Sequence, residues 1–194
     1  MTKLRIRHAK ECDLPRLLDL YEAAQCWIRS RGSDQWAGNT REKMLPRFRE
    51  SIARGECYVA EDGDGRLVGT VTVDEYADPE FWTTGDEPES ALYVHRMIVD
   101  RSLAGQDIGG ALLDWAADLA VARGRKWLRL DAWRTNRPLH AYYKKQGFTP
   151  VRIVELPHRG SGALFQRAVD QDTSARTTWR AKFAVGVSAP SHAP

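Results

Sequence analysis

The stretch that decides the fold is Ala91-Leu-Tyr-Val-His-Arg-Met-Ile-Val99, followed by Ala104-Gly-Gln-Asp-Ile-Gly-Gly110 and an apolar-periodic run to Ala120. The first part is rich in apolar and β-branched residues, as is typical of a buried strand. After the glycines, apolar residues recur at helical spacing, and Gly124 supplies a stop signal. A helix entered through glycines leaves its first backbone N–H groups free to attract an anion. The stretch therefore predicts a strand, a turn able to bind phosphate, and a helix.

The glycine spacing excludes two familiar nucleotide-binding motifs. No G-x-G-x-x-G follows a strand, and no G-x-x-x-x-G-K-[ST] occurs in the chain. Neither a dinucleotide-binding fold nor a P-loop is therefore expected. Glycine also serves in ordinary tight turns because it adopts positive φ, so the phosphate interpretation depends on the residues that follow.

A second strand and helix follow the first pair. Trp127-Leu-Arg-Leu-Asp-Ala-Trp133 has the pattern of a strand, and Asn136–Phe148 has that of a short helix ending at Gly147. The order of strand, glycine-containing turn, long helix, strand and Asn-to-Gly-Phe segment resembles the acyl-CoA-binding half of the GNAT superfamily of N-acetyltransferases. Two motifs in this order are more specific than either one alone.

Two alignments of the turn with the family pattern Q/R-x-x-G-x-G/A are open. Read from Gln106, the pattern Gln106-x-x-Gly109-x-Ala111 fits literally. Aligned with the following helix, Ala104 takes the Q/R position and Asp107 stands where a glycine is usual. We prefer the second alignment, because it puts Gly109 at the helix entrance. An aspartate beside a pyrophosphate is repulsive unless it points to solvent or caps the helix, so weaker CoA binding than the family suggests is expected.

Composition and charge bound the class of protein. The chain has 194 residues, 42% hydrophobic content and a net charge of +3 with dispersed basic residues, which favours a single folded domain and argues against a nucleic-acid binder. We expect a GNAT-like domain at 1–169 and a flexible tail at 170–194. No membrane span or signal peptide is visible, and three cysteines without C-x-x-C spacing predict neither a disulfide framework nor a metal site. A cytoplasmic location is the default.

One segment is strongly acidic. Between Asp74 and Ser90 there are seven acidic residues and no Lys or Arg. Two interpretations are open: a solvated acidic loop, or a surface that steers a cationic amine toward the site.

The predicted elements alternate in type along the chain. In chain order they are strand 4–8, a helix capped by Asp13, a helical region at 39–54 interrupted by Pro46, strands 57–61, 67–73 and 91–99, the long helix, strand 127–133, the short helix, and strands 148–155 and 163–167. This order predicts an α/β fold, a GNAT-like mixed β-sheet flanked by helices on both faces in a single domain.

The resemblance implies transfer of an acetyl group from acetyl-CoA to a primary amine of a small molecule or an amino terminus, by direct attack. It implies that backbone N–H groups near Met97, Ile98 and Val99 polarise the thioester carbonyl and contact pantetheine. Asn136 and Tyr142 are further expected contacts of the CoA. The turn residues expected to hold the pyrophosphate are Ala104, Gly105, Gln106, Asp107, Ile108, Gly109 and Gly110.

Tyr143 matches the family's general acid, because it stands four residues before Gly147. A phenol held at hydrogen-bond distance can protonate the departing thiolate. Neighbouring Tyr142 stays open for the same role, and an ordinary aromatic packed against the sheet is the alternative for either. Asn136 has a second interpretation too, as the cap of the helix that follows it.

His95 is the first candidate for the general base, because it lies beside the expected thioester and its ordinary pKa of about 6.5 suits a proton acceptor near neutrality. Strand alternation predicts His95, Met97 and Val99 on one face and Val94, Arg96 and Ile98 on the other. A half-buried structural histidine is the alternative. Asp131, Asp74 and Glu75 are further candidates, each of which can instead pair with an arginine.

Acceptor recognition is expected from the first two helices and the segment after the third strand. Trp27, Trp36 and Asp131 are the candidate substrate contacts, because aromatic and acidic side chains together can hold a cationic amine. We expect a small amine or amino-terminal acceptor and not a polyanion. Two other classes stay open: an acyl-CoA sensor without catalysis, and an interaction module that has lost the ligand. A homodimer is possible through the late strands.

Overall fold

The computed structural model describes residues 4–169, and the predicted tail at 170–194 lies outside the described residues. One seven-stranded sheet has the strand order β1-β2-β3-β4-β5-β7-β6. The pairing of β4 with β5 is parallel and the other pairings are antiparallel. The strands are β1 (Arg5–His8), β2 (Cys57–Glu61), β3 (Leu67–Asp74), β4 (Ala91–Val99), β5 (Trp127–Trp133), β6 (Thr149–Ile153) and β7 (Ser161–Ala168).

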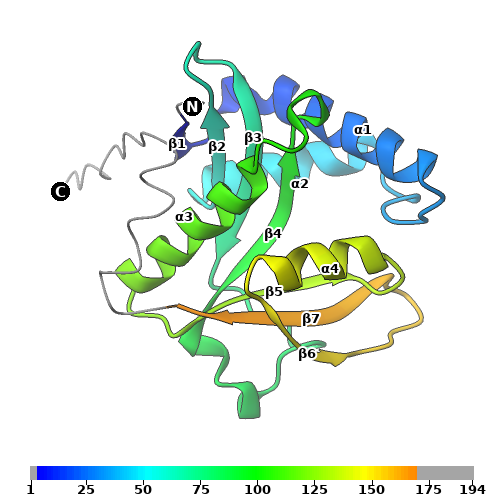
Figure 1. Cartoon of the computed structure of the whole chain (residues 1–194), viewed down its shortest axis with the longest axis vertical. Coiled ribbons are helices and arrows are strands. Elements are labelled where there is room, and N and C mark those ends of the chain that lie inside the picture. Colours follow the sequence, from blue (N-terminus) through cyan, green and yellow to red (C-terminus); the bar gives the residue numbers. More distant parts are fainter. Residues whose placement is uncertain (1–3, 170–194) are drawn as a thin grey trace.

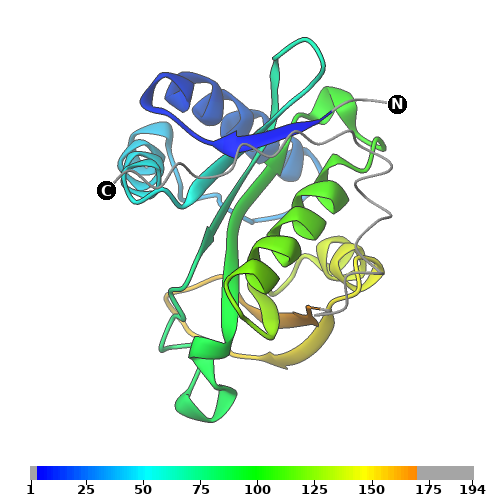
Figure 2. The ribbon, with the colours of Figure 1, turned by 90° about the vertical axis from the view of Figure 1, so that its left-hand side faces the viewer.

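Helices cover both faces of the sheet (Figure 2). The α-helices are α1 (Leu14–Ser30), α2 (Arg41–Ala53), α3 (Ile108–Ala122) and α4 (Arg137–Lys145). One apolar core lies between the sheet and α1 with α2, and a larger one lies between the sheet and α3 with α4. The predicted α/β fold, a mixed sheet with helices on both faces, is therefore confirmed.

Two helix starts differ from the sequence expectation. Asp13 precedes α1 but makes no side-chain cap, because its carboxylate pairs with Arg7 at 2.7 Å. Helix α2 begins at Arg41 under a cap from Thr40, so Pro46 lies within the helix. These early residues matter because α2 brings its side chains over β4.

Strands β4 and β5 pair only at their beginnings. Ala91–Tyr93 is in register with Trp127–Arg129, and beyond these residues the two strands diverge (Figure 1). The edge of β4 from Val94 to Val99 therefore faces no partner strand on the β5 side within the described part of the chain. Free backbone groups on such an edge are available to a ligand.

A β-bulge interrupts β4. Thr72 pairs with His95 and Thr70 with Ile98, so Val71 faces two residues of β4, and Arg96 takes φ +48°. A bulge shifts every later side chain to the other face. The predicted alternation is therefore confirmed after the bulge, where Met97 and Val99 lie on the α3 face and Arg96 lies with Ile98 on the α1 and α2 face. It is wrong before the bulge, because Val94 lies on the α3 face and its neighbour His95 therefore faces the other side.

The acidic segment between β3 and β4 is a packed element. Phe81 and Trp82 are buried against Tyr93 and Leu164, and the Trp82 ring lies between the guanidinium groups of two arginines. Its carboxylates pair with side chains of other elements: Asp74 with the His95 imidazole, Glu75 with Arg123 and Arg125, Asp78 and Glu80 with Arg159, Asp86 with Arg152, and Glu87 with Lys126. Both sequence interpretations of this segment, solvated loop and steering surface, overlooked these pairs.

Candidate functional site

The turn before α3 has the form that the preferred alignment requires. The helix begins at Ile108, and Asp107 precedes it at φ +57°. This left-handed conformation suits glycine and is tolerated by aspartate, which explains how Asp107 takes a glycine's place. Gly109 is the second helical residue. A side chain there would collide with the hydroxyl of Tyr142, which rests against the first turn of α3.

The carboxylate of Asp107 leans along α3 toward α4. It makes no cap for α3, and its Oδ1 accepts a hydrogen bond from Gln146 Nε2 at 3.4 Å. A Cβ at Gly110 would lie 2.5 Å from that same oxygen. The negative charge therefore lies at the helix entrance, on the side of α4.

Tyr142 and Tyr143 occupy different surroundings although they are neighbours on α4. Burial, with Asp107 and Asp114 nearby, raises the pKa of Tyr142 to about 12. Burial raises the pKa of Tyr143 further, and Tyr142 and Asp131 add to this effect. Tyr143 is 8% exposed and packs against Phe148. Tyr142 is thus directed at the α3 entrance, whereas Tyr143 is a neutral phenol buried against Phe148 and Phe165.

Asn136 links three elements. Its Oδ1 accepts from Leu139 N at 3.1 Å and so caps α4, as one of its two interpretations predicted. Its Nδ2 donates to Gln35 Oε1 at 2.6 Å, and Asp34 next to it accepts from Trp133 Nε1 at 2.7 Å. The segment between α1 and α2 is therefore held over the end of β5, which sequence reasoning did not foresee because the partners are about a hundred positions apart.

His95 forms a pair with Asp74. The distance from His95 Nε2 to Asp74 Oδ1 is 3.2 Å, and the histidine side chain is 23% exposed. Because a carboxylate only accepts, the proton of neutral His95 lies on Nε2, and Nδ1 is left as a proton acceptor. Two of the candidate bases, His95 and Asp74, are therefore hydrogen-bonded to each other. Glu75 is held by Arg125 at 2.9 Å instead.

The three predicted substrate contacts lie on different parts of the chain: α1, the segment between α1 and α2, and β5. Trp27 is 39% exposed on α1 and carries the Arg101 guanidinium 3.8 Å above its ring. Trp36 stacks on Tyr21 with ring centroids 5.0 Å apart. Asp131 lies on β5, between Leu130 and Ala132 of the α3 and α4 core, so its side chain is on the opposite face of the sheet.

Three residues that sequence reasoning assigned to no site gather on the α1 and α2 face: Tyr21, Arg47 and Arg96. The signal that could have found them is an arginine within a mostly apolar strand.

Among residues 4–169, no group of three or more His, Cys, Asp or Glu could hold a metal ion. The helices of this region include none long and apolar enough to cross a membrane, and all three cysteines are free.

Comparison with known proteins gives consistent results at the level of family. The model of the acetyltransferase (GNAT) family matches residues 16–148. An uncharacterized N-acetyltransferase of Bacillus subtilis is 30% identical over 125 residues, 63% of this chain and 68% of the relative. An uncharacterized N-acetyltransferase of Methanocaldococcus jannaschii is 28% identical over 152 residues, 77% of this chain. The chain spans 62% of the length of that second relative.

Solved structures share the fold. A GNAT-family acetyltransferase from Listeria monocytogenes superposes with a TM-score of 0.69 at 23% identity, covering 84% of this chain and 93% of the other. The PaiA N-acetyltransferase from Thermoplasma acidophilum, solved in complex with coenzyme A, gives a TM-score of 0.62 at 19% identity, over 86% of this chain and 99% of the other.

Proposed function

Because the chain belongs to the GNAT family of acetyltransferases, we propose that it transfers the acetyl group of acetyl-CoA to the primary amine of a small molecule or an amino terminus by direct attack. One observation carries this proposal. Met97 and Val99 of the open β4 edge, Ile108 at the α3 entrance and buried Tyr143 share one apolar cluster, and the His95–Asp74 pair lies on the opposite face.

The residues at the α3 entrance fit a CoA pyrophosphate. The first turn of α3 offers backbone N–H groups and the positive end of the helix dipole, and Gly109 lets the Tyr142 hydroxyl rest against that turn. The turn 104–110 would hold the pyrophosphate, while Met97, Ile98 and Val99 would hold the pantetheine amides, with Asn136 and Tyr142 at the sides. When bound, acetyl-CoA supplies the thioester that is attacked.

The chain's own groups then have separate tasks. Nδ1 of His95 accepts the proton that the attacking amine loses, and Asp74 stabilises the resulting imidazolium. Backbone N–H groups at the β4 edge stabilise the developing oxyanion. Tyr143 donates its proton to the departing sulfur. The C–N bond forms and the C–S bond breaks, so the products are an amide and CoA thiol.

Calorimetric titration with acetyl-CoA tests this proposal first. We expect micromolar binding, followed by CoA release when a panel of primary amines is added. A protein that binds acetyl-CoA and turns over no amine would be a sensor. No binding up to millimolar concentration would favour an interaction module and overturn the proposal.

The charge of Asp107 gives a second prediction. We expect Asp107→Gly to bind acetyl-CoA about 5- to 10-fold more tightly, because it removes a negative charge beside the pyrophosphate and restores glycine at a positive φ. Asp107→Asn separates the two effects, since it removes the charge and keeps a residue that tolerates this conformation. Calorimetry with CoA measures both variants. An unchanged dissociation constant in both would contradict a role for the charge.

A further inference from the structure

Arg96 is a cation held on β4 without a carboxylate partner. It projects from the bulge toward α2, with its guanidinium 6.0 Å from the Phe48 ring centroid. One of its nitrogens donates to Thr72 Oγ1 at 3.2 Å, while its buried Nε has no hydrogen-bond partner. Asp74 lies on the same face, but it pairs with His95. A guanidinium has five N–H donors, so most of this fork is unused within residues 4–169.

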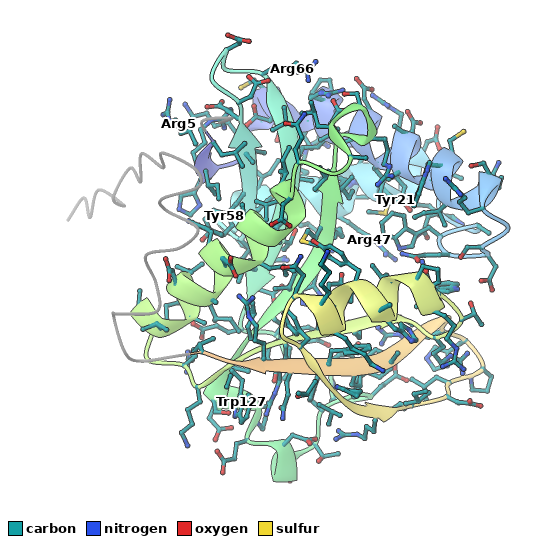
Figure 3. The ribbon with its side chains drawn as sticks, viewed as in Figure 1. Arg5, Tyr21, Arg47, Tyr58, Arg66 and Trp127 are labelled. Atoms are coloured by element: carbon teal, nitrogen blue, oxygen red, sulfur yellow. The ribbon has the colours of Figure 1, made fainter. Side chains whose placement is uncertain are left out.

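Arg47 on α2 is a second cation directed to the same place. Its side chain is exposed, and its guanidinium makes no hydrogen bond or ion pair with the described residues. The charge of Arg47 acts on Arg96: burial lowers the pKa of Arg96, Cys57 and Asp74 raise it, and Arg47 and Arg54 lower it further. Arg54 itself is held by Glu56 at 2.7 Å. Figure 3 shows Arg47 beside β4.

Tyr21 completes the cluster from α1. Its side chain is 1% exposed, and its buried hydroxyl has no hydrogen-bond partner within residues 4–169. Burial raises the pKa of Tyr21, while the Asn39 side chain and the charge of Arg47 lower it, so the Arg47 charge acts on this hydroxyl. Figure 3 shows these two side chains near each other. Tyr21 also packs edge-on against Phe48, with centroids 6.5 Å apart.

This combination is unusual for a purely structural cluster. Buried polar atoms are normally hydrogen-bonded, and a buried cation is normally paired, because leaving either one unsatisfied is costly. Here two cations and a hydroxyl lie on one face of the sheet, and the carboxylate of Asp74, whose charge acts on Arg96, is already paired with His95. An oxyanion with two acceptor oxygens would satisfy Nε of Arg96 and the Tyr21 hydroxyl, and it would screen the repulsion between the arginines. The planar guanidinium fork matches a carboxylate best.

We propose that Arg96, Arg47 and Tyr21 bind the carboxylate of the acceptor, so that the substrate is an amine that carries a carboxylate, as a free amino acid does. This inference rests on the proposed acetyl transfer. It identifies the acceptor class and assigns Arg96 as a specificity-determining residue.

The position of Arg96 suits this task. It lies between His95, which accepts the proton, and Met97, at the start of the backbone that polarises the carbonyl. The α3 entrance and Tyr143 lie on one face of the sheet, whereas Arg96 lies on the other. Acceptor and acetyl-CoA can therefore approach from opposite faces and meet where β4 and β5 diverge. A carboxylate held at Arg96 would leave an amine a few bonds away at the reacting carbonyl.

Matched acceptors test the inference. The common L-amino acids are each assayed beside the corresponding carboxamide and the amine left after decarboxylation, with acetyl-CoA and detection of CoA thiol. We expect the best amino acid to exceed its decarboxylated amine about 100-fold in kcat/KM. Arg96→Gln should remove that preference, through KM more than kcat, and Arg96→Lys should restore part of it. Rates with the decarboxylated amine should not change.

Arg47→Gln tests the subsite independently in case the Arg96 variants misfold, because Arg47 is exposed and its substitution should not disturb the core. We expect the KM of this variant for the amino acid to rise about 10-fold. Arg49→Gln is the matched control, since Arg49 is on the same helix and pairs with Glu11. Equal rates for the three forms of each acceptor, unaffected by Arg47→Gln and Arg96→Gln, would overturn the inference while leaving acetyl transfer intact. If no acceptor is turned over, the melting temperature is measured with N-acetyl amino acids and with their amides. A rise in melting temperature that only the carboxylates cause, and that Arg47→Gln abolishes, supports the subsite. The absence of any such rise overturns it.

Discussion

Tyr143→Phe is expected to lower kcat about 100-fold with little change in KM for acetyl-CoA. The phenol is buried, so the departing sulfur has little water from which to take a proton, and the substitution removes the only donor that we assign to it. The protein should stay folded, because the Tyr143 hydroxyl makes no hydrogen bond with residues 4–169 that would be lost. Steady-state kinetics with a saturating acceptor and a melting curve measure both expectations.

Tyr142→Phe is the matched control. The Tyr142 hydroxyl rests against Gly109 at the α3 entrance, so its loss should raise KM for acetyl-CoA a few-fold and spare kcat. If Tyr142→Phe lowered kcat and Tyr143→Phe did not, the assignment of the acid would be reversed.

The pH dependence of kcat gives a further check of the acid. Because burial raises the pKa of Tyr143 above its ordinary 10.0, the acid stays protonated at neutral and moderately basic pH, and kcat should not fall between pH 7 and pH 10 through its ionisation.

The order of elements could be predicted from the sequence because it depends on local signals. Apolar periodicity, the glycines around α3 and the cap at Asn136 each act within a few residues, and the structure has helices and strands in the predicted order. Only the exact boundaries of the elements, including the start of α2, differ between the sequence prediction and the structure. The family resemblance then assigned the candidate site to β4, α3 and α4, since the motifs themselves lie on these elements.

The remaining features depend on contacts between distant residues. The bulge at Arg96 arises from the pairing of β4 with β3, and a pattern of alternating residues cannot reveal it. The same antiparallel pairing brings His95 to Asp74, 21 positions away. The cluster of Tyr21, Arg47 and Arg96 joins two helices and a strand. Sequence reasoning therefore proposed a donor half of the site from local motifs and gave no sign of the Tyr21, Arg47 and Arg96 cluster, whose residues come together only in the folded chain.

The acidic segment shows the same limit, and it leads to the second large effect. Asp86 accepts from Arg152 Nη2 at 2.6 Å and from Thr83 N at 2.8 Å, with its side chain 17% exposed. We expect Asp86→Asn to lower the free energy of unfolding by about 2–3 kcal/mol, because several hydrogen bonds to a shielded carboxylate lose their charge. Chemical denaturation measures this loss. Glu75→Gln is the control: the Glu75 side chain is 53% exposed, and the cost of this substitution should be below about 0.5 kcal/mol.

The pH dependence of that loss has a definite sign. The hydrogen bonds from Arg152, with those from Thr83, hold the pKa of Asp86 well below its ordinary 3.8. A carboxylate with a lowered pKa stabilises the folded state fully above its unfolded value, and this stabilisation is lost as pH falls toward the folded value. The difference in stability between the natural protein and Asp86→Asn should therefore be constant from pH 7 to about pH 5 and shrink below pH 4. A difference that stayed constant down to pH 2 would contradict the assignment.

Asp86 also bears on catalysis, because its segment braces the point where β4 and β5 begin to diverge. The backbone oxygen of Asp86 accepts from Arg129 Nη2 at 2.7 Å, and Arg129 pairs with Tyr93 at the last position where the two strands are in register. Loosening this brace should let the strands shift around the acyl-CoA, so we expect Asp86→Asn to raise KM for acetyl-CoA while Glu75→Gln does not. If stability fell and KM stayed the same, the segment would support the fold alone, and the divergence of β4 and β5 would be fixed by the cores on either face of the sheet.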